Sequence, residues 1–140
     1  RGEGKEISAK GKSNNMNWYS AHLIFFYKKK SGNHDSYLLN ENIYLINAEN
    51  IEKAEDIANT IGTENQDFNE DGHLELNEEK VMYLYAGTRK IISVETQPEN
   101  DEFFASKSGV EVSYSEFEVD SIEQVFSLAK GEMVDILYRE

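Results

Sequence analysis

The chain has 140 residues, no cysteine, one proline and a formal net charge of −13. A chain of this length is expected to form a single domain, and its eight Tyr and seven Phe argue against disorder. The lack of cysteine excludes disulfides, thiolate catalysis and Cys-type zinc sites, and it fits a reducing compartment such as the cytoplasm.

The charge is distributed unevenly along the chain. Residues 1–30 hold seven of the 14 bases and two of the 27 acids, a net charge of +5, so the rest of the chain carries −18. An acidic body of this kind repels phosphate groups, which argues against nucleic acid and anionic membranes as partners. It would attract a cationic protein at long range. The alternative is that the acids only keep the protein soluble.

The first 15 residues are polar and lack any apolar period. Because Met16 follows them directly, we interpret it as a natural start codon after a tag or other upstream sequence, with a native flexible arm as the alternative. The domain is then residues 16–140. Its first segment, Trp18–Tyr27, is apolar on both alternating faces, which predicts a central strand that is covered on both sides.

Strand and helix patterns follow one another along the rest of the domain. Asn50 fits a helix N-cap and Gly62 a helix stop, while Ser121 and Gln124 fit a capping box that starts a second helix. In chain order, the sequence predicts strands at 17–27, 37–48, 80–86, 89–96, 110–117 and 133–138, and helices at 50–62 and 121–130.

These elements predict an α+β fold. We expect five or six mainly antiparallel strands, with a first hairpin at 17–48, a second around Gly87-Thr88, and two helices packed on one face of the sheet. In residues 110–117, Val110, Val112 and Tyr114 alternate with polar residues, which predicts a half-exposed strand. A mixed sheet remains an alternative because the last strand follows a helix.

Residues 67–78 match the calcium-binding loop of EF-hands. Asp67, Asn69 and Asp71 would supply side-chain oxygens, Gly72 the sharp turn and Glu78 the closing carboxylate. The context argues against this site, because the preceding helix is expected to stop at residue 62 and a strand pattern follows residue 78. We therefore predict a polar turn and no metal or cofactor, and calcium binding stays an alternative.

The sequence contains no recognisable catalytic constellation. None of the three histidines, His22, His34 and His73, has a histidine partner at helical spacing, and neither a nucleophile elbow nor a phosphate-binding glycine loop is present. We therefore predict no catalytic residues.

Four short segments together resemble a known family. They are Trp18-Tyr19-Ser20-Ala21 after Met16, residues 41–48 leading into a helix at 52–62, Tyr85-Ala86-Gly87 to Lys90-Ile91, and residues 109–116. This pattern resembles a family of small bacterial domains of unknown function that open on a W-Y-S-A strand, over about residues 17–117. The resemblance implies no catalytic residues. By analogy only, domains of this size and acidity are similar in kind to immunity proteins of bacterial toxin systems.

The first functional hypothesis is a non-enzymatic acidic protein that neutralises a cationic partner, such as a bacterial toxin. The alternatives are a small ligand-binding or regulatory domain, with or without calcium, and an enzyme. The residues predicted to face the cationic partner are Glu64, Asp67, Glu70, Asp71, Glu99, Asp101 and Glu102.

Overall fold

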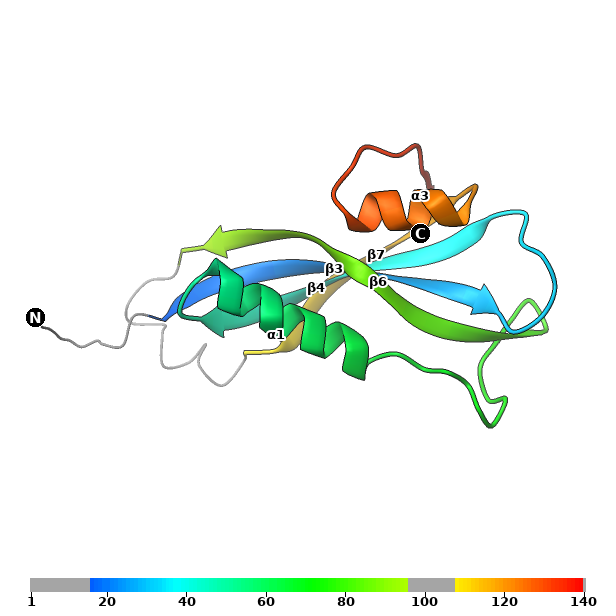
Figure 1. The fold of residues 1–140 in the computed structure, drawn as a ribbon, viewed down its shortest axis with the longest axis horizontal. Helices are drawn as coiled ribbons and strands as arrows, with labels where there is room; N and C mark the ends of the chain where they lie inside the picture. Colours follow the sequence, from blue (N-terminus) through cyan, green and yellow to red (C-terminus); the bar gives the residue numbers. More distant parts are fainter. Residues whose placement is uncertain (1–15, 96–107, 140) are drawn as a thin grey trace, which may run out of the picture.

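The computed structural model describes residues 16–95 and 108–139, which form a single six-stranded sheet with two helices. The predicted α+β class is confirmed, and every pair of neighbouring strands is antiparallel. The elements in chain order are β3 (Asn17–Lys29), β4 (Tyr37–Ala48), α1 (Ile51–Glu64), β5 (Glu75–Leu76), β6 (Glu79–Val94), β7 (Val110–Val119), α3 (Ile122–Ala129) and β8 (Leu137–Arg139). Figure 1 labels the two helices and the four longest strands.

Strand β3 lies at the centre of the sheet, between β6 and β4 in the order β5-β6-β3-β4-β7-β8. Its pairing with β4 runs from Asn17 opposite Ala48 to Phe26 opposite Leu39, as expected for the first hairpin. The side chains from Leu23 to Phe25 have no exposed surface, although successive residues point to opposite faces. The prediction of a central strand covered on both sides is therefore confirmed.

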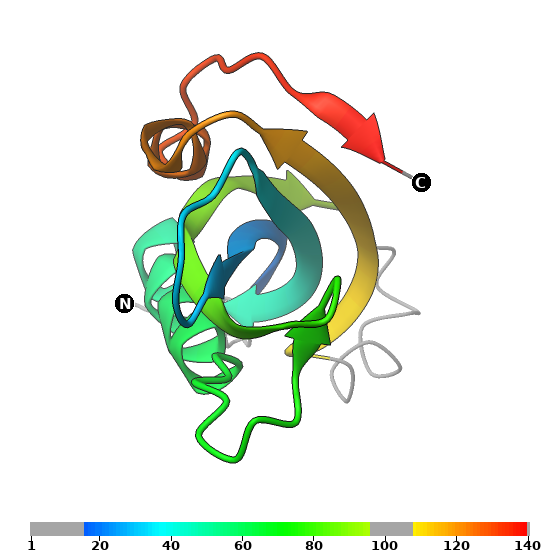
Figure 2. The same ribbon diagram turned by 90° about the vertical axis from the view of Figure 1, so that its right-hand side faces the viewer.

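The two helices cover opposite faces of the sheet, so the prediction that both pack on one face is wrong. The odd-numbered side chains of β3, from Tyr19 to Phe25, pack against α1. The even-numbered Ile24 and Phe26 pack against α3. Because β3 has apolar side chains on both faces of the sheet, each helix packs against a different apolar face. Figure 2 looks along the molecule and shows how strongly the sheet coils between them.

Strand β6 is one continuous strand, so the predicted second hairpin is wrong. It pairs with β3 from Val94 to Val81, and the register shifts twice near its middle. Gly87 lies at one of these shifts with φ of 151°, and a Cβ there would approach the Cβ of Ala129 in α3 to 3.3 Å. Gly87 is therefore required for a β-bulge and for a close contact with α3. A glycine between two strand-like segments is also typical of a turn, so the sequence does not distinguish the two cases.

Helix α1 begins as predicted and ends later than predicted. The Asn50 side chain accepts a hydrogen bond from the Lys53 backbone N–H at 2.8 Å, which confirms the N-cap. Gly62 does not stop the helix, which continues to a C-cap at Asn65. A Cβ at residue 62 would lie 2.5 Å from the Tyr85 ring, so this glycine lets the helix lie close to β6.

The C-terminal part of the fold contains one confirmed and one wrong prediction. Ser121 and Gln124 form the capping box of α3. In contrast, Val110, Val112 and Tyr114 are 43%, 56% and 64% exposed, so this part of the strand is exposed on both faces and not on one. The pairing of β4 with β7 shifts register in the same region, between Ile43 and Tyr44. The last strand is the short β8, and within residues 16–95 and 108–139 neither helix is long and apolar enough to span a membrane.

Candidate binding face

The face of the sheet that carries α1 continues past that helix as an open, polar surface. On this side, Tyr27 pairs with Tyr83 across β3 and β6, and the even-numbered side chains of β4 pair with those of β7. We call this surface the open face. Its residues are Tyr27, Lys29, Leu38, Asn40, Asn42, Tyr44, Val81, Tyr83, Glu111, Tyr114, Glu116 and Glu118.

A cavity of about 280 Å³ lies in the middle of the open face, next to the C-terminal end of α1. We call it the amide pocket, and it is lined by Asn40, Asn42, Tyr44, Asn65, Tyr83, Glu111 and Tyr114. The side-chain nitrogens of Asn40 and Asn42 donate to the Tyr83 hydroxyl at 3.0 and 3.1 Å. Both Oδ1 atoms are buried and have no hydrogen-bond partner among the described residues. Buried amide oxygens normally have a partner in the protein or in ordered water, so these two are candidate atoms for binding water or a ligand.

Tyr83 holds the floor of the amide pocket in a fixed position. Its ring stacks on the buried Phe25 with centroids 4.9 Å apart, and the Tyr27 ring contacts it at the same distance. Burial raises the pKa of Tyr83 to about 12, so its hydroxyl keeps its proton at neutral pH. The Tyr83 ring is thus held by the core, and the Tyr83 hydroxyl is held by the hydrogen bonds from Asn40 and Asn42.

Three glutamates and one lysine give the open face a net negative charge. Burial, followed by the Glu111 charge and its hydrogen bond, raises the pKa of Tyr44. Burial, followed by the Glu116 charge, raises the pKa of Tyr27. Both hydroxyls therefore remain protonated beside a carboxylate. Among the described residues that line the amide pocket there is no Lys, Arg or His.

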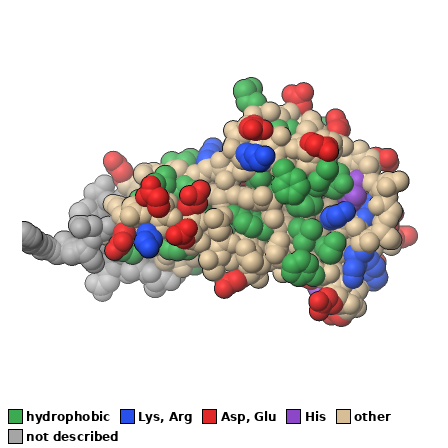
Figure 3. Space-filling model, in the orientation of Figure 1, with side chains coloured by type: hydrophobic (Ala, Val, Ile, Leu, Met, Phe, Trp, Pro, Cys, Tyr) green, Lys and Arg blue, Asp and Glu red, His purple; other side chains and the backbone are tan. Residues whose placement is uncertain are grey.

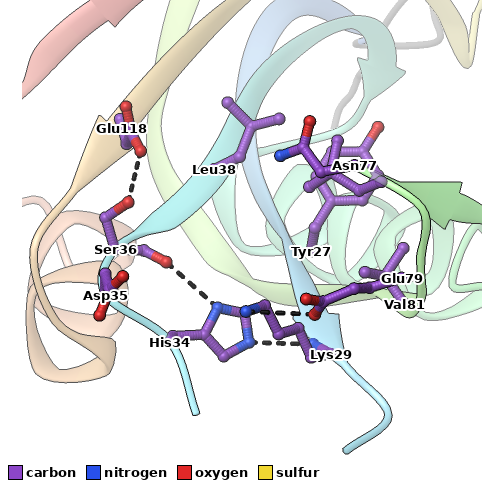
Figure 4. Close-up of a pocket in the computed structure, with 11 residues that line it drawn as sticks. Tyr27, Lys29, His34, Asp35, Ser36, Leu38, Asn77, Glu79, Val81 and Glu118 are labelled. Atoms are coloured by element: carbon purple, nitrogen blue, oxygen red, sulfur yellow. Dashed lines mark hydrogen bonds and ion pairs between the residues drawn. The ribbon is translucent and has the colours of Figure 1, made fainter. Parts of the chain in front are cut away.

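A second cavity, of about 320 Å³, lies at the far end of the open face (Figure 4). Lys29 Nζ lies 3.2 Å from a carboxylate oxygen of Glu79 on one side, and the Ser36 hydroxyl donates to Glu118 on the other. The Lys29 backbone N–H donates to His34 Nε2 at 2.9 Å, so the proton of this ring is on Nδ1, 3.1 Å from the Ser36 carbonyl. Five polar residues of this cavity therefore already have partners, unlike the two amide oxygens of the amide pocket; they are Lys29, His34, Ser36, Glu79 and Glu118.

The residues predicted to face a cationic partner lie in two different settings. Glu64 and Glu70 are exposed, whereas Asp67 and Asp71 both contact the His73 ring. Glu99, Asp101 and Glu102 lie outside the described residues, as do residues 1–15. The sequence reading missed the exposed acids of α1 that gather over this helix in Figure 3, which are Glu52, Glu55 and Asp56. Their helical spacing could have identified them.

The loop that resembles an EF-hand is held together by its own side chains. The buried Asn69 side chain donates to the carbonyls of Leu74 and Val81 and accepts from the Leu74 N–H. The loop leads into the β5–β6 hairpin and not into a helix, as expected for a polar turn. In the described part of the chain, no group of three or more His, Cys, Asp or Glu is arranged to hold a metal ion.

A buried charged cluster lies on the opposite side of the sheet from the open face. Glu41 is 6% exposed, and its carboxylate lies 2.6 Å from His22 Nδ1 and 2.7 Å from Arg89. No sequence motif indicates this cluster, because its members come from three strands. The three groups satisfy one another, so we interpret the cluster as structural.

Comparison with known proteins identifies a family and no activity. No curated protein and no solved structure matches the chain. Residues 18–113, which include β3, β4, α1, β6 and the start of β7, match a family described as a domain of unknown function, DUF4288. This range agrees with the resemblance seen in the sequence. The chain is therefore a member of the DUF4288 family.

Proposed function

We propose that this protein is a non-enzymatic binding protein that neutralises a cationic protein partner in the cytoplasm, as an immunity protein does for a toxin. The observation that carries the proposal is the acidic surface of helix α1. The solvent side of α1 carries Glu52, Glu55 and Asp56, and the helix ends at Glu64, next to the amide pocket residue Asn65. Lys53 is the only base in α1.

An acidic surface of this kind accelerates encounter with a basic protein. Complementary charges steer two proteins together, and the effect on the association rate decreases as salt screens them. The net charge of −13 supplies the long-range attraction, and the acids on α1 give it a direction. Binding then needs no catalytic group of its own, because neutralisation requires only that the active surface of the partner is covered.

The test is binding to the product of the adjacent gene, measured at several salt concentrations. Changing Glu52, Glu55 and Asp56 to Lys should lower the association rate about tenfold at low salt. A matched control changes Glu123, Glu132 and Asp135 to Lys, which alters the net charge equally in the exposed surface around α3. If the adjacent gene product does not bind even at low salt, or if both variants behave alike, the proposal is wrong.

A second candidate function is a small ligand-binding domain. The observation that favours it is the pair of unpartnered amide oxygens in the pocket of about 280 Å³, near the lower limit of ligand-pocket size. The EF-hand-like loop lends no support to a calcium-assisted version, since Asp67 and Asp71 both face His73.

A further inference from the structure

The amide pocket combines three features that a positively charged, donor-rich group requires. It has two buried carboxamide oxygens without partners, a carboxylate at Glu111, and tyrosine rings at its wall. Asn42 is only 7% exposed, so its free oxygen is not a surface group that bulk water satisfies. Acceptors, negative charge and aromatic faces together favour a cation with several N–H groups.

The orientation of the amides does not remove this requirement. Turning over one of the two carboxamides would let the Tyr83 hydroxyl donate to its oxygen, but the oxygen of the other asparagine would still lack a partner. In either arrangement at least one buried amide oxygen lacks a partner in the described part of the chain. Water or a ligand from outside the chain is therefore needed to complete the hydrogen bonding of this pocket.

The shape and chemistry of the wall favour a planar cation. Tyr114 is 64% exposed and stands at the edge of the pocket, where its ring is available for stacking. A guanidinium group is flat, always charged and rich in donors, and it stacks on aromatic rings while it binds oxygens in its plane. An ammonium group cannot use the stacking surface in this way.

We propose that the amide pocket receives an arginine side chain of the cationic partner, with Asn40 and Asn42 accepting its N–H groups and Glu111 balancing its charge. This inference rests on the proposed function for the identity of the partner, while the pocket chemistry stands by itself. The acids of α1 attract the partner, and the pocket at the end of α1 fixes its register. Long-range attraction and specific recognition thus come from adjacent parts of one surface.

The direct test uses N-acetyl-arginine methylamide, with the neutral isostere N-acetyl-citrulline methylamide as the matched ligand control. The arginine compound at millimolar concentration should shift the side-chain amide NMR signals of Asn40 and Asn42, and the citrulline compound should not. Glu111→Gln or Tyr114→Ser should weaken arginine binding about fivefold, and Glu123→Gln on α3 should leave it unchanged. Both altered residues are exposed, so both variants should fold, which circular dichroism verifies.

The outcomes separate this inference from the proposed function. If the arginine compound gives no shift, if citrulline gives the same shift, or if Glu111→Gln and Tyr114→Ser bind as the wild type does, the arginine pocket is wrong. A cationic partner that still binds all of these variants at wild-type affinity would leave the proposed function intact and overturn the pocket. Conversely, arginine binding in the pocket without any cationic protein partner would support the pocket and overturn the proposed function.

Discussion

The face of the sheet that packs against α1 has two halves of opposite character. Under the helix, the side chains are apolar and buried, as in the core cluster that contains Leu23, Ile46 and Ala58. Beyond the helix, the same strands present Asn40, Asn42 and several tyrosine hydroxyls. A half built only for stability would continue the apolar pattern and carry another covering element. A polar, solvated face is ordinary in an antiparallel sheet, so the feature that sets the open half apart is its two buried amide oxygens without a partner. The proposed binding of a partner rests on these two oxygens.

The largest expected difference between the two halves is in stability. Leu23→Ala removes a side chain with no exposed surface and should lower the free energy of unfolding by about 3 kcal/mol. Tyr114→Ser on the open half should change it by less than about 0.5 kcal/mol, because Tyr114 is 64% exposed. Urea unfolding followed by circular dichroism measures both. Equal losses in the two variants would show that the open half is part of the core.

A smaller effect is expected inside the amide pocket itself. Asn42→Leu removes one unpartnered oxygen and the Asn42 hydrogen bond to Tyr83, and it leaves the Asn40 hydrogen bond to Tyr83 in place. Loss of the unpartnered oxygen should stabilise and loss of the hydrogen bond should destabilise, each by about 1 kcal/mol, so the free energy of unfolding should change by less than about 1 kcal/mol. The same unfolding measurement tests this.

Asn40→Leu is the matched variant for that measurement, because Asn40 Oδ1 is also unpartnered and its nitrogen also donates to Tyr83. It should behave as Asn42→Leu does. A loss of more than about 1 kcal/mol in both variants would mean that the amides serve the fold.

The sequence predicted the covered half of this face much better than the open half. Local signals were sufficient for the strand at Trp18–Tyr27, the N-cap at Asn50 and the capping box at Ser121, because each depends on residues close together in the chain. The predictions that Gly62 ends a helix and that Gly87 forms a turn are wrong. A glycine needed for close packing and a glycine that ends an element cannot be told apart in a sequence.

The open half depends on contacts between distant residues, which a single sequence does not reveal. Asn40 and Asn42 meet Tyr83 across more than 40 positions, and Glu111 reaches the same pocket only because β7 pairs with β4. Read locally, Asn40 and Asn42 are polar residues in a strand, with nothing to indicate their burial. The prediction that both helices pack on one face of the sheet is wrong for a similar reason. The apolar stripe of a helix predicts that the helix packs against the sheet, but it does not indicate which face of the sheet it covers.

The smallest expected effect concerns the loop that borders the open half. Asp67 pairs through its backbone with Tyr83, and its carboxylate contacts His73, which also contacts Asp71. The hydrogen bond from Asp71, followed by the one from Asp67, raises the pKa of His73 above 6.5. The hydrogen bond with His73 lowers the pKa of Asp71 below 3.8.

The signs of these two shifts define a pH window for the loop. A raised histidine pKa stabilises the folded loop fully below pH 6.5, and this contribution is lost as the pH rises through the raised value. A lowered aspartate pKa stabilises it above pH 3.8, and this contribution is lost as the pH falls through the lowered value. The contacts should therefore be strongest between pH 3.8 and 6.5. The exposure of both groups keeps the effect small.

Amide hydrogen exchange, corrected for its intrinsic pH dependence, measures this loosening. Protection of the Asn69 and His73 amides should fall as the pH rises through the His73 pKa, while protection of β3 under α1 should not change. In His73→Gln the loop should lose this pH dependence. An NMR titration of His73 with a midpoint at or below 6.5 would contradict the prediction, because an imidazole held between two carboxylates must release its proton later than a free one. Among the described residues, the covered half has no histidine between two carboxylates at its border. A pH response that is confined to the loop would therefore be a further difference between the open half and the covered half.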